Sequence, residues 1–185
     1  MNEGERVRNM NHVELVVTVL RKMSDFKLQY PGKKALQKLV YLIGRRGVRP
    51  DFHYSIHYYG PYSSKLDDTV HSLQLQGIVE IVPDGMNHRV RLIEELQEFI
   101  EDPHLSEKES QEIEYVLRNF GTLTPYDLEV ITTADFVAGE LGKILKPLTE
   151  EAIVEGVKKI KGDKFPDQNI RDALAVLKQH GYVWN

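Results

Sequence analysis

The stretch from Lys33 to Val82 constrains the fold of this chain more than any other part of the sequence. Apolar residues between Leu36 and Ile43 recur at three- and four-residue spacing, which is the period of one helix face. The aromatic run Phe52–Tyr59 then alternates between two sets of side chains, which is typical of a strand with two different faces. The order predicted for this stretch is therefore helix, strand, helix and strand.

A corner and a hairpin complete this part of the chain. Gly60-Pro61 is predicted to end the aromatic strand, and Ser63 or Ser64 to cap the helix that follows it. Turn residues at 83–88 separate a strand at 78–82 from an alternating strand at 89–93, which predicts a hairpin. Helix, strand, turn and strand is the order of a recognition helix and its wing.

The other segments are predicted to be helical. Asn11 is the expected N-cap of a first helix from His12 to about Phe26. Ser106 with Glu109 three residues later matches a capping box. Further helices are predicted for residues 94–101, 106–120, 126–145 and 150–161, with a last one starting at Asp167 or Asn169.

The predicted fold class is α+β and mostly helical. Residues 1–93 are expected to form a winged-helix-like part, and residues 94–185 a helical part packed against the first as one compact unit. Whether residues 146–185 form a separate unit is left open.

Composition is that of a globular protein. The 185 residues are 41% hydrophobic and 28% charged. No apolar run reaches the roughly 18 residues of a membrane span, and the N-terminal residues lack the apolar core of a signal peptide, so we expect a cytoplasmic protein. With no cysteine in the chain, disulfides, thiolate nucleophiles and cysteine-based metal sites are excluded.

Charge is distributed unevenly along the sequence, although the net charge is only -4. Between Gly32 and Arg49 six cations occur without an acidic residue: Lys33, Lys34, Lys38, Arg45, Arg46 and Arg49. Between Glu94 and Glu114 nine acidic residues accompany the single cation Lys108. The first segment suits a polyanion, and the second suits either solvent or a basic partner. The alternative is that the cations simply pair with the acidic half of the chain.

The segments GKKALQKLVYLIG and SIHYYGPYSSKLDDTVHSLQLQGIV resemble the YwgA-like family and, more distantly, the SocA-type or Panacea antitoxin domain. The matching residues are Lys38, Leu39, Tyr41, Tyr59, Gly60, Pro61 and Tyr62, and the resemblance covers roughly residues 12 to 145. Panacea domains usually carry a tryptophan before the Gly-Pro corner, where this chain has Tyr58-Tyr59. The YwgA-like resemblance strengthens the fold prediction and implies no activity, whereas the Panacea resemblance implies neutralisation of a toxin by direct binding.

The basic helix and the wing are the candidate nucleic-acid-binding surface, because cations that contact phosphates give the sequence-independent part of such binding. Asp67 and Asp68 oppose this hypothesis, since carboxylates repel a phosphate backbone. The candidate residues are Lys33, Lys34, Lys38, Arg45, Arg46, Ser63, Ser64, Lys65 and Arg89.

Neither a metal site nor a catalytic site is predicted, and no cofactor. His53 and His57 share a strand face but would stand roughly 13 Å apart, too far for one metal ion. Phosphate-binding and serine-nucleophile motifs do not occur. The tyrosines of the aromatic strand could stack on bases or line a pocket, and packing against a helix is the simpler interpretation.

Two functions follow from these patterns. The first is a DNA-binding protein that resembles a transcriptional regulator, has no catalytic activity and takes double-stranded DNA as its partner. The alternative is an antitoxin-like module whose acidic segment, Glu94 to Glu114, binds and neutralises a partner protein. Pairing of two copies through the C-terminal helices is left open, because no heptad register is sustained. The operator, the partner protein and any small-molecule effector cannot be read from the sequence.

Overall fold

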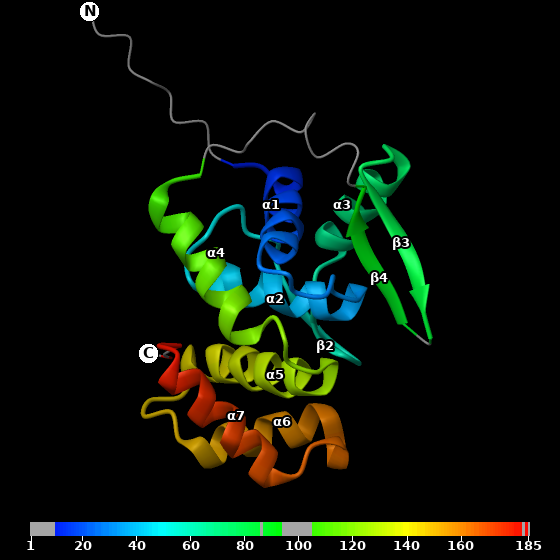
Figure 1. The fold of residues 1–185 in the computed structure, drawn as a ribbon. Coiled ribbons are helices and arrows are strands. Elements are labelled where there is room, and N and C mark those ends of the chain that lie inside the picture. The colour runs from blue at the N-terminus through cyan, green and yellow to red at the C-terminus, as the bar shows by residue number, and fades with distance from the viewer. Residues whose placement is uncertain (1–9, 86, 94–104, 183, 185) are drawn as a thin grey trace, which may run out of the picture. The chain divides into compact units, whose positions relative to one another are not determined.

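Figure 1 shows a computed structural model of the chain, which describes residues 10–85, 87–93, 105–182 and 184. Over these residues the fold is mostly helical with two small antiparallel hairpins, which confirms the predicted α+β class. The chain divides into two compact units. The first comprises Met1–His53 and Ser64–Thr122, and the second comprises Tyr54–Ser63 and Leu123–Asn185.

Over its described residues, the first unit combines four helices and a β-hairpin. Its elements are α1 (His12–Asp25), α2 (Lys33–Arg45), α3 (Ser64–Leu75), β3 (Val79–Asp84), β4 (Asn87–Leu92) and α4 (Glu107–Phe120). Helix α4 contacts both α1 and α2, α3 contacts α1, and β4 packs against α1 and α2 (Figure 1). The hairpin pairs Val79 with Leu92 and reverses next to Gly85, whose positive φ of 58° suits a tight turn.

Local signals place the helix ends of this unit where the sequence predicts them. Asn11 accepts a hydrogen bond from the Glu14 amide at 3.0 Å, and the Glu14 carboxylate accepts one from the Asn11 amide at 2.6 Å. Ser106 and Glu109 form the same reciprocal pair at the start of α4. These capping boxes satisfy backbone donors that a helix N-terminus leaves without intrahelical partners. The predicted first helix and the helix at 106–120 are both confirmed, and the helix predicted at 94–101 lies outside the described residues.

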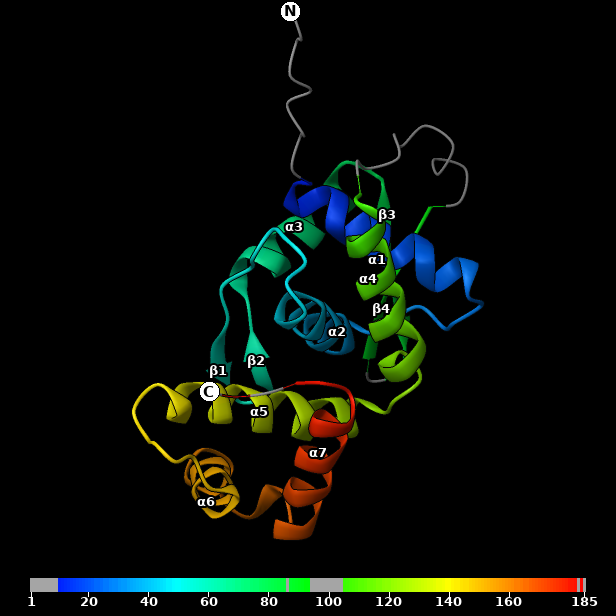
Figure 2. The ribbon, with the colours of Figure 1, turned by 90° about the vertical axis from the view of Figure 1, so that its left-hand side faces the viewer.

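The second unit is built around a buried helix. Its elements are β1 (Ser55–His57), β2 (Gly60–Tyr62), α5 (Pro125–Gly142), α6 (Glu150–Lys161), the 3-10 turn η2 (Gly162–Lys164) and α7 (Asp167–Gln179). Figure 2 shows α5 between the β1–β2 hairpin and the pair formed by α6 and α7. Because α5 has neighbours on both sides, it is buried around most of its circumference, from Leu128 to Ala138.

The aromatic strand is shorter than predicted, and the Gly-Pro corner does not end it. Only Ser55–His57 is extended, and Gly60 and Pro61 form the second strand of a hairpin, opposite His57 and Ile56. Gly60 has a φ of 90°, which lets the chain reverse within two residues.

The compact units also group the chain differently from the predicted border at residue 93. Helix α4 packs within the first unit, and the β1–β2 hairpin within the second.

Among the described residues, no helix combines the length and the apolarity that a membrane crossing requires.

Candidate functional site

The cations at the two ends of α2 meet acidic residues of the first unit. The Lys33 ammonium lies 2.9 Å from Asp67 Oδ1 on α3. The Arg46 guanidinium, at the C-cap of α2, forms an ion pair with Glu112 of α4 and lies 4.2 Å from the centre of the Tyr115 ring. Both cations therefore hold α2 to its neighbours, and Arg46 does so through the acidic half of the chain, as the pairing alternative from the sequence proposed.

Two of the predicted contact residues are buried, Lys38 on α2 and Ser63 before α3. Their side chains cannot reach a phosphate group in this structure, which corrects the predicted surface. The reason is that the buried face of α2 is broader than its apolar stripe and takes in Gln37 and Lys38 together with Leu36 and Leu39.

The wing residue Arg89 has a structural role. Its guanidinium lies 2.6 Å from Asp84 Oδ2 and donates a hydrogen bond to the Tyr30 carbonyl oxygen at 2.7 Å. The ion pair joins the two strands of the β3–β4 hairpin, and the hydrogen bond holds the hairpin to the loop that precedes α2. The other predicted residues, Lys34, Arg45, Ser64 and Lys65, are exposed.

The acidic helix α4 is paired in the same way. Glu114 accepts a hydrogen bond from Lys22 of α1 at 2.7 Å, and this bond lowers the pKa of the Glu114 carboxyl. Glu112 pairs with Arg46, and Glu109 belongs to the capping box. Arg46 and Glu112 thus join the basic and the acidic segment, and the described acids Glu109, Glu112 and Glu114 have partners within the chain.

Among the tyrosine and phenylalanine side chains that the structure describes, the two at the tip of the β1–β2 hairpin are the most exposed. Tyr58 is 76% exposed and Tyr59 is 45% exposed. Their ring centres lie 4.8 Å apart with the planes at 86°, an edge-to-face pair. From the sequence, packing against a helix was the simpler interpretation of these rings. It is wrong for Tyr58 and Tyr59, because both residues lie in the two-residue turn between β1 and β2. The motif residues Gly60 and Pro61 are buried, and the Tyr62 ring lies 4.7 Å from that of His57.

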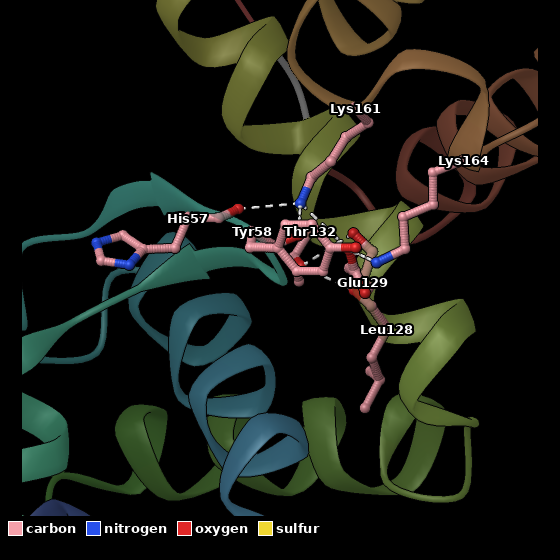
Figure 3. Close-up of polar contacts among 7 residues, drawn as sticks. All are labelled: His57, Tyr58, Leu128, Glu129, Thr132, Lys161 and Lys164. Atoms are coloured by element: carbon pink, nitrogen blue, oxygen red, sulfur yellow. Dashed lines mark hydrogen bonds and ion pairs between the residues drawn. The ribbon is translucent and has the colours of Figure 1, made fainter.

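A buried ammonium group holds this tip (Figure 3). Lys161, the last residue of α6, donates hydrogen bonds to the carbonyl oxygens of His57, at 3.0 Å, and of Tyr58. It donates a third to Glu129 Oε1 on α5, at 3.2 Å. An ammonium group has three N–H donors, so all of them have acceptors here. The side chain is only 4% exposed, and this burial lowers the pKa of Lys161, while the Glu129 carboxylate opposes the shift.

A second lysine stands at the edge of the same cluster. Lys164 Nζ lies 2.7 Å from Glu129 Oε1 and 5.1 Å from the centre of each of the Tyr58 and Tyr59 rings. These distances are within the range of cation–π attraction. Its side chain is 30% exposed, so this ammonium group is reachable from solvent. We call Tyr58, Tyr59, Lys161, Lys164 and Glu129 the tip cluster.

The tip cluster could not be found from the sequence, because its members come from three separate segments of the chain. One signal was available: Glu129 is a carboxylate flanked by the apolar residues Leu128 and Val130, and a buried charge needs a partner. Among the described residues, no group of three or more metal-ligating side chains is positioned to hold an ion.

Comparison with models of protein families gives no match, and comparison with curated proteins gives none either. The YwgA-like and Panacea resemblance therefore stays a prediction.

Proposed function

We propose that this protein acts by binding a partner protein, with the tip of the β1–β2 hairpin at the centre of the contact. The observation that carries the proposal is the exposed Tyr58–Tyr59 pair on a turn whose backbone is hydrogen-bonded to the buried Lys161 ammonium. Tyrosine is enriched among the residues that contribute most to protein–protein binding, because it offers a large contact area with few rotatable bonds.

The fixed backbone of the tip supports the proposal further. A loop that becomes ordered on binding loses conformational entropy, which weakens the complex. Here Lys161 already holds two carbonyl oxygens of the turn, and β2 packs on α5. The two rings are therefore presented in a defined geometry before any partner arrives.

The charges of the first unit favour this antitoxin-like role over DNA binding. Of the residues predicted to contact double-stranded DNA, Lys38 and Ser63 are buried, and Lys33, Arg46 and Arg89 have acidic partners. The acidic residues Glu109, Glu112 and Glu114 of α4 also have internal partners, so the proposed contact is the hairpin rather than α4. Binding of double-stranded DNA remains a prediction with less support.

Photo-crosslinking in the native host tests the proposal. Tyr58 is replaced by the photoreactive amino acid p-benzoylphenylalanine, and Leu75 on α3, which is 90% exposed, is replaced in a control chain. We expect a discrete, protease-sensitive adduct from position 58 and none from position 75. A nuclease-sensitive adduct, equal adducts from both positions, or no adduct from position 58 would each overturn the proposal.

A further inference from the structure

We infer that the tip cluster recognises an acidic segment of its partner, in which a carboxylate lies next to an apolar side chain. The carboxylate would pair with Lys164 while the apolar side chain lies on the tyrosine rings. This inference rests on the proposed function and adds to it the chemistry of the partner.

The charge balance of the tip cluster is the first observation. Two ammonium groups, Lys161 and Lys164, share the single carboxylate of Glu129, which leaves one positive charge in excess. The three hydrogen bonds of Lys161 are internal and its side chain is nearly inaccessible. The excess charge is therefore presented to solvent by Lys164.

The position of Lys164 is the second observation. Its ammonium group is equidistant from the centres of both exposed rings, at 5.1 Å. An apolar side chain that covers Tyr58 would partly remove water from this ammonium group, and ion pairs with less solvent around them are stronger. A carboxylate next to that side chain would thus gain both the charge interaction and the contact area.

A nucleic acid fits the same cluster less well. Polyanion binding draws on several cations that neutralise several phosphates, whereas the tip cluster offers one excess charge beside the Glu129 carboxylate. Successive bases stack on parallel aromatic surfaces, and the two tyrosine rings are nearly perpendicular. The observations therefore favour an acidic peptide segment.

Peptide selection on the intact protein tests the inference. A phage library that displays random 12-residue peptides is selected on the immobilised full chain, and the frequency of Asp and Glu beside apolar residues is compared with that of the unselected library. The same selection is made on Lys164→Gln and on the control Lys159→Gln. The control removes an exposed cation near the end of α6. A Tyr58→Ser/Tyr59→Ser variant tests the rings, and circular dichroism checks that each variant is folded.

We expect acidic residues to be enriched on the wild-type chain and on Lys159→Gln, and to fall to the library frequency on Lys164→Gln. Lys164→Gln should weaken binding of a selected acidic peptide about tenfold, the effect typical of one charged hydrogen bond. The double tyrosine variant should select no peptides.

Several results would overturn the inference: no enrichment on the wild-type chain, peptides without an acidic preference, or an acidic preference that persists on folded Lys164→Gln. Selection that persists on the double tyrosine variant would also contradict it. If photo-crosslinking from position 58 gives a protein adduct and peptide selection gives any of these results, the proposed function stands. Only the inference that the partner segment is acidic would then be wrong.

Discussion

The Lys161 ammonium group donates a hydrogen bond to the His57 carbonyl oxygen at 3.0 Å, although the two residues are 104 positions apart in the chain. This contact joins the end of α6 to the turn of the β1–β2 hairpin. Because the same ammonium group also binds Glu129, one side chain holds together a helix end, a buried helix and a hairpin within the second unit.

Replacing Lys161 with methionine should destabilise the second unit. The change removes the three hydrogen bonds of Lys161, and it leaves Glu129 with Lys164 as its ammonium partner. We therefore expect a loss of about 2 kcal/mol in the free energy of unfolding. Chemical denaturation measures this loss, and amide hydrogen exchange should become faster at residues 55–62. Lys159→Met is the matched control and should change stability by less than about 0.5 kcal/mol. Equal stability of the two variants would show that Lys161 does not hold the hairpin.

Lys161 should also make stability depend on alkaline pH. Burial lowers its pKa in the folded state below the ordinary value of 10.5, so the folded state binds fewer protons than the unfolded state between these two pKa values. The contribution of Lys161 to the free energy of unfolding therefore rises with pH across that window. We expect the wild-type chain to gain stability relative to Lys161→Met as pH approaches 10.5. A difference that stays constant or shrinks with rising pH would contradict the lowered pKa.

The ion pair between Lys22 and Glu114 should contribute stability that acid removes. The Lys22 hydrogen bond lowers the pKa of Glu114 from 4.5, so the contribution is complete above that value and is lost as pH falls through the lowered pKa. Because both side chains are partly exposed, Glu114→Gln should cost only about 0.5–1 kcal/mol at pH 7. Urea unfolding at pH 7 and at strongly acidic pH measures the effect. The same loss at both pH values would mean that packing rather than charge is responsible.

Trp184 should stabilise the end of the second unit through a buried carboxylate. Its indole N–H donates a hydrogen bond to Asp135 Oδ1 at 2.8 Å, and Asp135 is fully buried in α5. Trp184→Phe removes that donor and should lower the free energy of unfolding by about 1–3 kcal/mol. Circular dichroism during denaturation measures the change. Asp135→Asn keeps an acceptor for the indole and should have the smaller effect, and the reverse order would contradict the importance of this hydrogen bond.

A labelled random DNA duplex should bind the protein weakly or not at all. The cations Lys33, Arg46 and Arg89 are held by acidic residues, and Lys38 is buried, so only part of the predicted basic surface can displace counterions from phosphates. Fluorescence anisotropy at low and at moderate salt measures this directly. Binding that is tight at low salt and falls steeply as salt rises would instead support the DNA-binding prediction, and neutralising the exposed residues Lys34 and Lys65 would then locate it.

Local sequence patterns predicted the structure correctly where the interacting groups lie within one helical turn. Asn11 was predicted as an N-cap and Ser106 with Glu109 as a capping box, and in both cases the side chain bonds to a residue three positions later. Apolar periodicity then predicted most helices and the mostly helical class, because the spacing of buried positions depends only on helix geometry.

The sequence alone thus determined the helices, their caps and the separation of basic and acidic segments. Only the tertiary structure decided where those charges go: Arg46 meets Glu112, Lys38 is buried, and Lys161 crosses to the hairpin turn. The physical reason is that an amphipathic pattern specifies which face of an element is buried but not which element covers it. Whether a lysine pairs within the chain or faces solvent depends on that neighbour, and the tip cluster exists because α5, α6 and the hairpin meet.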